Sequence, residues 1–151
     1  MDEYAFTQKE ADSLYFPKKM ARAISVIGDE MLADAGIKTY HLAVLRSVYT
    51  HEGSDQKSIR KAVPFDKSRI SVIVRELIDE GLIEDKASGR SSALFLTEKG
   101  KQAVYLTPEF RKKVNEELFK DFKESEINDM IRLFEKLNDR MDEILGKDSV
   151  Y

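Results

Sequence analysis

The most restrictive feature of this sequence is a pair of short helical patterns separated by a proline in the middle of the chain. A helix is predicted from about Asp55 to Val63, and Pro64 ends it because proline lacks a backbone N–H and clashes with the preceding turn. Asp66 is a favourable cap for a second helix, which Gly81 ends. The apolar side of this second helix is formed by Ile70, Ile73, Val74, Leu77 and Ile78. Two short helices joined by so tight a turn predict a helix–turn–helix.

Two extended segments follow these helices. Residues 82–86 and 91–96 flank a small Ser-Gly turn, which is typical of a β-hairpin. Thr97 begins a further helix, and Thr107 with Pro108 marks another start, since proline is favoured in the first helical turn. The chain is therefore predicted to be mainly α-helical, with a small β-hairpin beside the helix–turn–helix.

Helical patterns also occupy both ends of the chain. A helix over Thr7–Leu32 begins with capping-box spacing, and Pro17 should start or kink it. Thr39 can cap the next helix, which should end near Gly53. Ser125 can cap the last helix. The apolar residues of that helix alternate at intervals of three and four: Ile127, Met130, Phe134, Leu137, Met141 and Ile144.

This narrow apolar seam must be buried against something. The two terminal helical blocks either pack on each other within one chain or pack across a dimer. Spacing alone leaves both arrangements open, and we favour the dimer.

Composition excludes several classes of protein. The 151 residues predict one domain, and the absence of cysteine excludes a disulfide scaffold, a cysteine nucleophile and a thiol switch. The start of the chain lacks the features of a signal peptide, and no apolar run is long enough to span a bilayer. We therefore expect a cytoplasmic protein with no membrane partner.

The distribution of charge is more informative than its total. The chain has 25 Lys and Arg against 28 Asp and Glu, a net charge of −3. Between Gln56 and Arg75, however, six Lys or Arg side chains accompany one Asp, so this stretch carries +5 and the rest carries −8. A solvated basic face is the commoner explanation of such a run. That explanation is weaker here because the charges coincide with a helix–turn–helix and with Arg90 at the hairpin tip.

The stretch from Asp66 to Gly100 resembles the winged helix–turn–helix of the multiple-antibiotic-resistance regulator (MarR) family. The matching features are the Asp-Lys-Ser helix start, the apolar positions after it, Gly-Leu-Ile, an arginine at the wing tip, and Leu-Thr-Glu-Lys-Gly. Each piece is weak alone, but their order and spacing are specific. Thr39–Leu45 and the terminal helices match the family's second helix and dimerisation region more loosely.

The resemblance implies a homodimeric prokaryotic repressor that binds a pseudo-palindromic operator in double-stranded DNA. Residues 37–100 would form the DNA-binding lobe, and residues 7–35 and 101–146 would form the dimerisation helices. Helix 66–80 would enter the major groove, and the 85–91 wing would reach the minor groove. The expected DNA contacts are Lys57, Lys61, Lys67, Ser68, Arg69, Ser71, Arg75, Lys86 and Arg90.

Three positions depart from the family's pattern. Ser88 stands where an acid usually fixes the wing arginine, and Val72 stands where an arginine is frequent. Arg60 stands where a small residue usually packs, so its stem should run along the apolar surface with its head outside. We expect these departures to affect operator sequence and affinity rather than DNA binding itself.

Other chemistry is not indicated. His41 and His51 are the only histidines and have no metal-ligand spacing, so no metal site is predicted. We expect His41 to be a polar residue at a helix interface and His51 to be exposed. No serine lies in a nucleophile elbow and no glycine loop could cradle phosphates, so we expect neither an enzyme nor a cofactor.

The resemblance also implies a small aromatic or phenolic effector bound between the DNA-binding lobe and the dimerisation helices. The residues on segments that could meet there are Phe16, Tyr40, His41, Tyr49, Tyr105 and Phe110. The simpler explanation for any one of these aromatic rings is that it fills the core. A function of a different class, a winged-helix module that binds a protein and no DNA, also stays open, as does a sensor whose main output is ligand binding. The +5 stretch argues against the protein-binding module.

Overall fold

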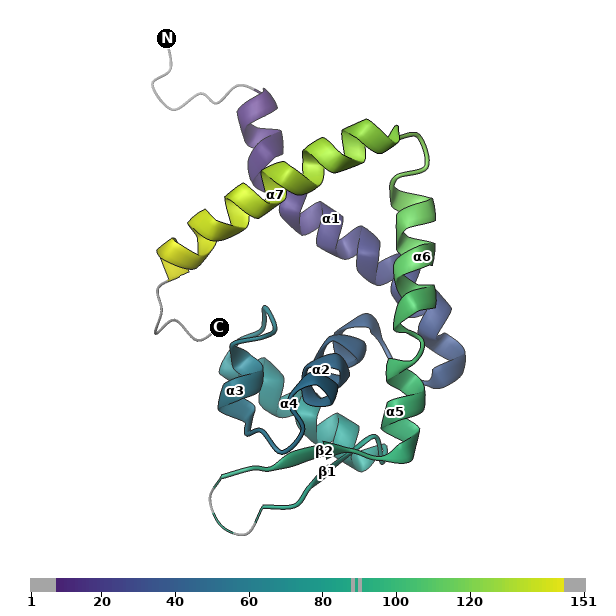
Figure 1. Cartoon of the computed structure of the whole chain (residues 1–151), viewed down its shortest axis with the longest axis vertical. Coiled ribbons are helices and arrows are strands. Elements are labelled where there is room, and N and C mark those ends of the chain that lie inside the picture. Colours follow the sequence, from purple (N-terminus) through teal and green to yellow (C-terminus); the bar gives the residue numbers. More distant parts are fainter. Residues whose placement is uncertain (1–7, 88, 90, 146–151) are drawn as a thin grey trace.

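The computed structural model describes residues 8–87, 89 and 91–145, with side chains from Tyr15 onward. A compact lobe contains helices α2, α3, α4 and α5 and one hairpin, while α1, α6 and α7 lie to one side of it (Figure 1). The elements are α1 (Gln8–Leu32), the 3-10 turn η1 (Ala33–Ala35), α2 (Thr39–Thr50), α3 (Gln56–Arg60), α4 (Lys67–Asp79), β1 (Ile83–Asp85), β2 (Leu94–Leu96), α5 (Glu98–Val104), α6 (Thr107–Leu118) and α7 (Glu124–Leu145). The predicted fold class, mainly α-helical with a small antiparallel hairpin, is confirmed.

Helix α2 lies at the centre of the lobe. It packs against α1, α4, α5 and β2, and most of its apolar side chains are buried. The largest fully buried side chains come from α1, α2, α3, α4 and the two strands: Leu32, Leu42, Leu45, Ile59, Ile70, Ile73, Leu77, Ile83 and Leu94, with three valines of α2 and α4. The core therefore fixes α4 in the lobe through α2.

Three of the helices, α3, α4 and α5, start with a side-chain cap. The Asp66 carboxylate accepts the Arg69 N–H at 2.8 Å at the start of α4, and Thr97 Oγ1 accepts the Gly100 N–H at 3.1 Å at the start of α5. Both caps agree with the sequence. Asp55 caps α3 in the same way, but α3 ends at Arg60 and is shorter than predicted.

Two details near the N-terminus differ from the prediction. Pro17 does not start α1, which runs from Gln8 through this position, while the alternative that it kinks the helix stays a prediction. Thr39 is the first helical residue of α2 rather than its cap, because its hydroxyl and N–H both bond to Asp29 of α1.

Two further boundaries also differ. Helix α2 ends at Thr50, before Gly53. Helix α7 begins at Glu124, so Ser125 is not its cap; the Glu126 carboxylate accepts the Lys123 N–H at 3.0 Å instead.

Two glycines allow helices to approach closely. A Cβ on Gly28 of α1 would lie 2.4 Å from both Phe110 Cε2 of α6 and Thr39 Oγ1 of α2. A Cβ on Gly100 of α5 would lie 2.0 Å from the Leu82 carbonyl oxygen beside β1. These positions bring α1 against α6, and α5 against the base of the hairpin.

Helix α7 differs from the rest of the molecule. None of its residues is buried, and within the described residues it makes at most marginal contact with other elements. Its apolar side is exposed, including Phe134, Leu137 and Met141. No helix in the described ranges is both long enough and apolar enough to cross a membrane.

Candidate nucleic-acid interface

Helix α4 presents a polar side away from the core. Ile70, Ile73, Val74 and Leu77 are at most 2 % exposed and hold the helix in the lobe. Lys67, Ser68 and Arg75, all predicted DNA contacts, are exposed on the other side, and Val72 is also exposed there. Because Asp66 bonds to the first turn, Lys67 and Ser68 project from a capped helix start.

Gln56 joins the three parts of this surface. Its backbone N–H donates to Ser92 Oγ of the wing at 3.0 Å. Its side-chain Oε1 lies 3.2 Å from Ser71 Oγ, which is half-buried and also lies 3.0 Å from the Lys67 carbonyl oxygen. The hydroxyl of Ser71, a predicted DNA contact, thus links α4 to α3. No charge or hydropathy pattern in the sequence singles out Gln56.

A groove of about 360 Å³ separates the start of α3 from the wing. Lys57 lines it and is exposed, and Lys61 is exposed just after α3. The Asp55 carboxylate on the same rim accepts the N–H and hydroxyl of Ser58, and these two hydrogen bonds hold the pKa of Asp55 below its ordinary value. Among the residues that the structure describes, the lining of this groove therefore carries one cation, Lys57, beside the acidic groups of Asp55 and Asp85.

The wing is held at its base by a side chain that sequence reasoning missed. The β1 and β2 strands pair antiparallel, and Asp85 Oδ1 accepts the N–H groups of Ala87 and Ala93 at 3.0 Å each. Lys86 Nζ lies 4.9 Å from the centre of the Phe95 ring and 3.8 Å from Glu84. The predicted contact Arg90, like Ser88, lies outside the described residues.

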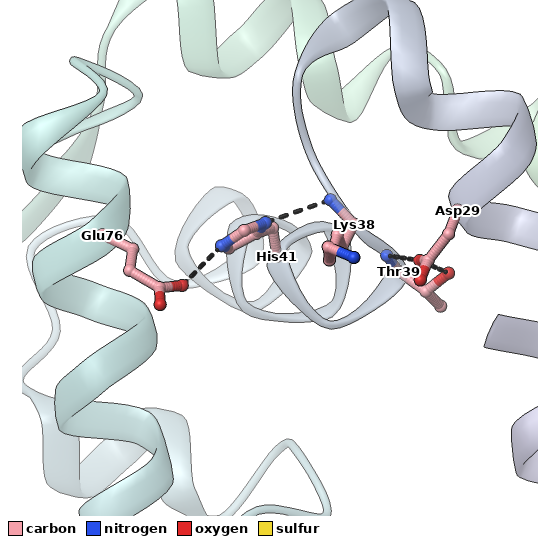
Figure 2. Close-up of polar contacts among 5 residues, drawn as sticks. All are labelled: Asp29, Lys38, Thr39, His41 and Glu76. Atoms are coloured by element: carbon pink, nitrogen blue, oxygen red, sulfur yellow. Dashed lines mark hydrogen bonds and ion pairs between the residues drawn. The ribbon is translucent and has the colours of Figure 1, made fainter.

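Arg69 and Glu76 lie on the flank of α4 that faces α2. Arg69 is exposed, but its Cζ lies 4.5 Å from the centre of the Tyr40 ring. His41 Nε2 lies 2.7 Å from Glu76 Oε2, as Figure 2 shows. The prediction that His41 sits at a helix interface is confirmed, and His51 is exposed as expected.

Arg60 is half-buried. Its Nε atom is buried and has no hydrogen-bond partner within the described residues. Across all the residues that the structure describes, no group of three His, Asp or Glu side chains is placed to hold a metal ion.

The six predicted effector residues do not converge on one site. Tyr40 and Phe110 are half-buried against the core, and the Phe110 ring packs beside Gly28 of α1. Tyr40 and His41, in contrast, face Arg69 and Glu76 of α4. Phe16 is 60 % exposed on α1. A second group is formed by two exposed tyrosines on α2 and after α5: Tyr49 and Tyr105.

The two tyrosines border a groove of about 380 Å³. Their rings meet edge to face with centres 6.5 Å apart. Arg46 and Thr50 of α2 and Thr107 of α6 complete the polar lining. The groove therefore offers one guanidinium, hydroxyl groups and two aromatic faces.

Comparison with known proteins agrees with the architecture. Residues 43–100 match the family model of the F-93 winged-helix domain. This match covers the lobe from within α2 to the start of α5, which contains the helix–turn–helix and the wing. No curated protein matches the chain by sequence.

Solved structures match over nearly the whole chain. The organohalide-sensing regulator RdhR, solved with 2,4-dichlorophenol bound, is 17 % identical with a TM-score of 0.82, over 100 % of this chain and 92 % of that one. A MarR transcriptional regulator from Methanosarcina mazei Go1 is 23 % identical with a TM-score of 0.75, over 94 % and 96 %. BpsR from Bordetella bronchiseptica, whose DNA binding is regulated by 6-hydroxynicotinic acid, is 16 % identical with a TM-score of 0.75, over 89 % and 98 %.

The chain is thus a winged-helix protein with additional helices at both ends. Its fold over the full length is that of the MarR-family transcriptional regulators, in agreement with the resemblance of its central sequence.

Proposed function

We propose that this chain is a MarR-type, homodimeric DNA-binding transcription regulator of the prokaryotic cytoplasm, and that it represses a pseudo-palindromic operator. The observation that carries this proposal is the basic side of α3 and α4, where Lys57, Lys61, Lys67 and Arg75 are exposed around one helix–turn–helix. Helix α4 enters the major groove and the wing reaches the minor groove. No step of this function requires catalysis, a metal or a cofactor.

The division of labour follows the fold. Residues 37–100 form the DNA-binding lobe, and residues 7–35 and 101–146 pair two chains. The exposed apolar side of α7 supports the pairing, because a helix that leaves Phe134, Leu137 and Met141 uncovered gains stability by burying them. A second copy supplies an identical stripe, which a two-fold axis can bring face to face with the first.

The decisive experiment is DNA selection followed by binding measurements. The purified protein selects duplexes from a randomised pool, and fluorescence anisotropy compares the selected duplex with a random duplex of equal length. We expect tighter binding to the selected duplex and a steep loss of affinity as salt rises. Absence of any sequence preference at physiological salt contradicts the proposal and favours a protein-binding winged helix.

Variants separate base reading from phosphate binding. We expect Lys57→Ala and Lys61→Ala to weaken binding of the selected and the random duplex equally, because a contact to phosphate carries no sequence information. Arg69→Ala should instead change the preferred sequence. An equal loss on both duplexes for Arg69→Ala contradicts a role of Arg69 in sequence preference.

We further propose that a small aromatic compound with a phenolate or carboxylate group releases the DNA. The groove with Arg46, Tyr49 and Tyr105 supports this ligand class, since a guanidinium pairs with an anion and the two rings can pack against an aromatic ring. RdhR was solved with 2,4-dichlorophenol, and BpsR is regulated by 6-hydroxynicotinic acid. An alternative effector site would be lined by the other expected residues: Tyr40, His41, Phe110 and Phe16.

A thermal-shift titration tests this part. Both named compounds should raise the melting temperature of the wild-type protein. Arg46→Gln should remove the shift without changing the melting temperature of the free protein, because Arg46 is exposed. A shift that Arg46→Gln retains but Tyr40→Leu loses places the ligand at the other group of residues.

A further inference from the structure

The first turn of α2 is bonded to the helices on both sides of it. Asp29 Oδ1 of α1 accepts the Thr39 N–H at 2.7 Å and the Thr39 hydroxyl at 2.8 Å (Figure 2). The carboxylate therefore satisfies a free N–H at the start of α2 and also lies at the positive end of the helix dipole. This contact fixes α2 relative to α1.

His41 makes the next contact, and its hydrogen bonds define its tautomer. Its Nδ1 accepts the backbone N–H of Lys38 at 3.0 Å, so in the neutral ring the proton is on Nε2. Nε2 donates to Glu76 Oε2 of α4 at 2.7 Å. One imidazole thus caps the start of α2 with one nitrogen and holds α4 with the other, as Figure 2 shows.

Tyr40 makes a second contact with α4. The centre of its ring lies 4.3 Å from the centre of the His41 ring and 4.5 Å from Arg69 Cζ. Arg69 and Glu76 are seven residues apart, which places them on the same flank of α4 and about 10 Å apart along its axis. Adjacent residues of α2 therefore hold α4 at two points.

Two contacts on one flank restrict rotation of α4 about its own axis. The buried contacts of Ile70, Ile73 and Leu77 are apolar, and such contacts have little directionality. A rotation of about 20° would move a side-chain tip about 6 Å from the axis by about 2 Å. A hydrogen bond to a base edge tolerates only about 0.5 Å, so reading a base requires this rotation to be fixed.

We propose that Tyr40 and His41 are positioning residues for DNA recognition, which set the rotation of α4 and connect it, through Thr39 and Asp29, to α1. The proposal rests on the proposed function, since it concerns how α4 reads DNA. Neither Tyr40 nor His41 touches DNA in this scheme. They act through Arg69 and Glu76 of α4. The contacts therefore connect α1, which packs on α6, to α4, which reads the operator.

Two variants of His41 separate its two bonds. In His41→Asn, Oδ1 can replace Nδ1 as acceptor for the Lys38 N–H, but nothing reaches Glu76. In His41→Gln, the Nε2 amide can replace the ring Nε2–H toward Glu76. The measurement is the ratio of affinities for the selected duplex and for a random duplex. We expect His41→Asn to lower this ratio about tenfold, the effect of one misplaced base contact, and His41→Gln to keep it near the wild-type value.

Substitutions on the other partners provide matched controls. Glu76→Gln retains an acceptor for His41 and should keep the ratio, whereas Glu76→Ala should lower it. Asp79→Ala removes the same charge from an exposed position of α4 and should raise affinity for both duplexes alike. Tyr40→Phe keeps the ring under Arg69 and should keep the ratio, while Tyr40→Leu should lower it.

The outcomes distinguish this inference from the function on which it rests. A wild-type protein with no preference for the selected duplex overturns the proposed function and this inference together. A wild-type preference that His41→Asn, Glu76→Ala and Tyr40→Leu all retain overturns the positioning role alone. Melting temperatures are measured for every variant. A ratio that falls only in variants with lowered melting temperatures also overturns the positioning role, because a purely structural contact would produce that result.

Discussion

The winged-helix lobe and helix α7 differ in how they bury their apolar side chains. In the lobe, Leu45, Ile70 and Leu94 are 0 % exposed, and their neighbours come from several elements of the same chain. In α7, Leu133 is 53 % exposed and Leu137 is 49 % exposed, although both lie on an amphipathic helix. The lobe thus completes its own core, whereas α7 leaves its apolar side uncovered.

This difference indicates which contacts each region needs in order to be stable. A helix with an exposed apolar stripe is only marginally stable alone, because most helical stability in proteins comes from packing of that stripe. Mutations in the lobe should therefore change the free energy of unfolding of one chain. Mutations on the apolar side of α7 should change the association of chains.

The largest expected effect is on association. Leu137→Glu places a carboxylate in the apolar stripe of each of two chains, and loses the burial of two leucine side chains. Because Leu137 is already half-buried in the single chain, the lost burial is worth about 0.7–1.5 kcal/mol for each leucine. With the cost of placing two carboxylates in the interface, the dimer should weaken by roughly 3–6 kcal/mol, or about 10²–10⁴-fold in dissociation constant. Analytical ultracentrifugation measures the change.

Asn128→Glu is the matched control, since it adds the same charge on the opposite, exposed side of α7. It should leave the dimer intact. If Leu137→Glu and Asn128→Glu sediment alike, the apolar stripe is not the interface between chains.

The next effect concerns the lobe. Leu45→Ala removes a 0 % exposed side chain from the middle of α2 and should lower the free energy of unfolding by about 2–5 kcal/mol. Leu133→Ala makes the same truncation at a half-exposed position of α7. Both variants are measured by urea unfolding in the Leu137→Glu background. There, Leu133→Ala should lower the free energy of unfolding far less than Leu45→Ala does. Equal costs would mean that α7 packs on its own chain and would remove the contrast between the two regions.

A smaller effect is expected where α5 meets the wing. In Gly100→Ala the new Cβ would lie 2.0 Å from the Leu82 carbonyl oxygen, and a backbone atom cannot move aside as a side chain can. We expect a loss of about 1–3 kcal/mol in unfolding free energy. Gln102→Ala, at an exposed position of the same helix, should change it by less than about 0.5 kcal/mol. A tolerated Gly100→Ala would mean that α5 can shift relative to the hairpin.

The lobe was also the region best predicted from the sequence. Asp66 and Thr97 identify helix starts because a short polar side chain just before an apolar helical repeat can accept a free backbone N–H of the first turn. Gly81 adopts a positive φ of 71°, as its place after α4 predicts. These signals are local, so a single sequence contains them.

Other features depend on residues far apart in the chain and could not be predicted. Asp29 takes the role that Thr39 was expected to play at the start of α2, because α1 brings its carboxylate within 2.7 Å of the Thr39 N–H. Ser71 turns to Gln56 because α3 packs beside α4. The pairing of His41 with Glu76 likewise spans 35 residues, and no local pattern connects them.

The smallest expected effect concerns Asp55, the residue that caps α3. Asp55→Ala removes the cap of α3 and should cost about 1 kcal/mol near neutral pH. The pKa of Asp55 is below its ordinary value of 3.8 in the folded protein, because the charged carboxylate accepts two hydrogen bonds from Ser58. The ionised carboxylate therefore stabilises the fold above that ordinary value. This contribution is lost as the pH falls through the lowered pKa.

Asp55→Asn keeps an acceptor for the Ser58 N–H but cannot ionise. Urea unfolding at neutral and acidic pH should show wild type and Asp55→Asn converging as the pH falls, with Asp55→Ala less stable than Asp55→Asn at each pH. A difference between wild type and Asp55→Asn that does not change with pH would mean that the charge of Asp55 contributes nothing. The cap would then act as a neutral acceptor.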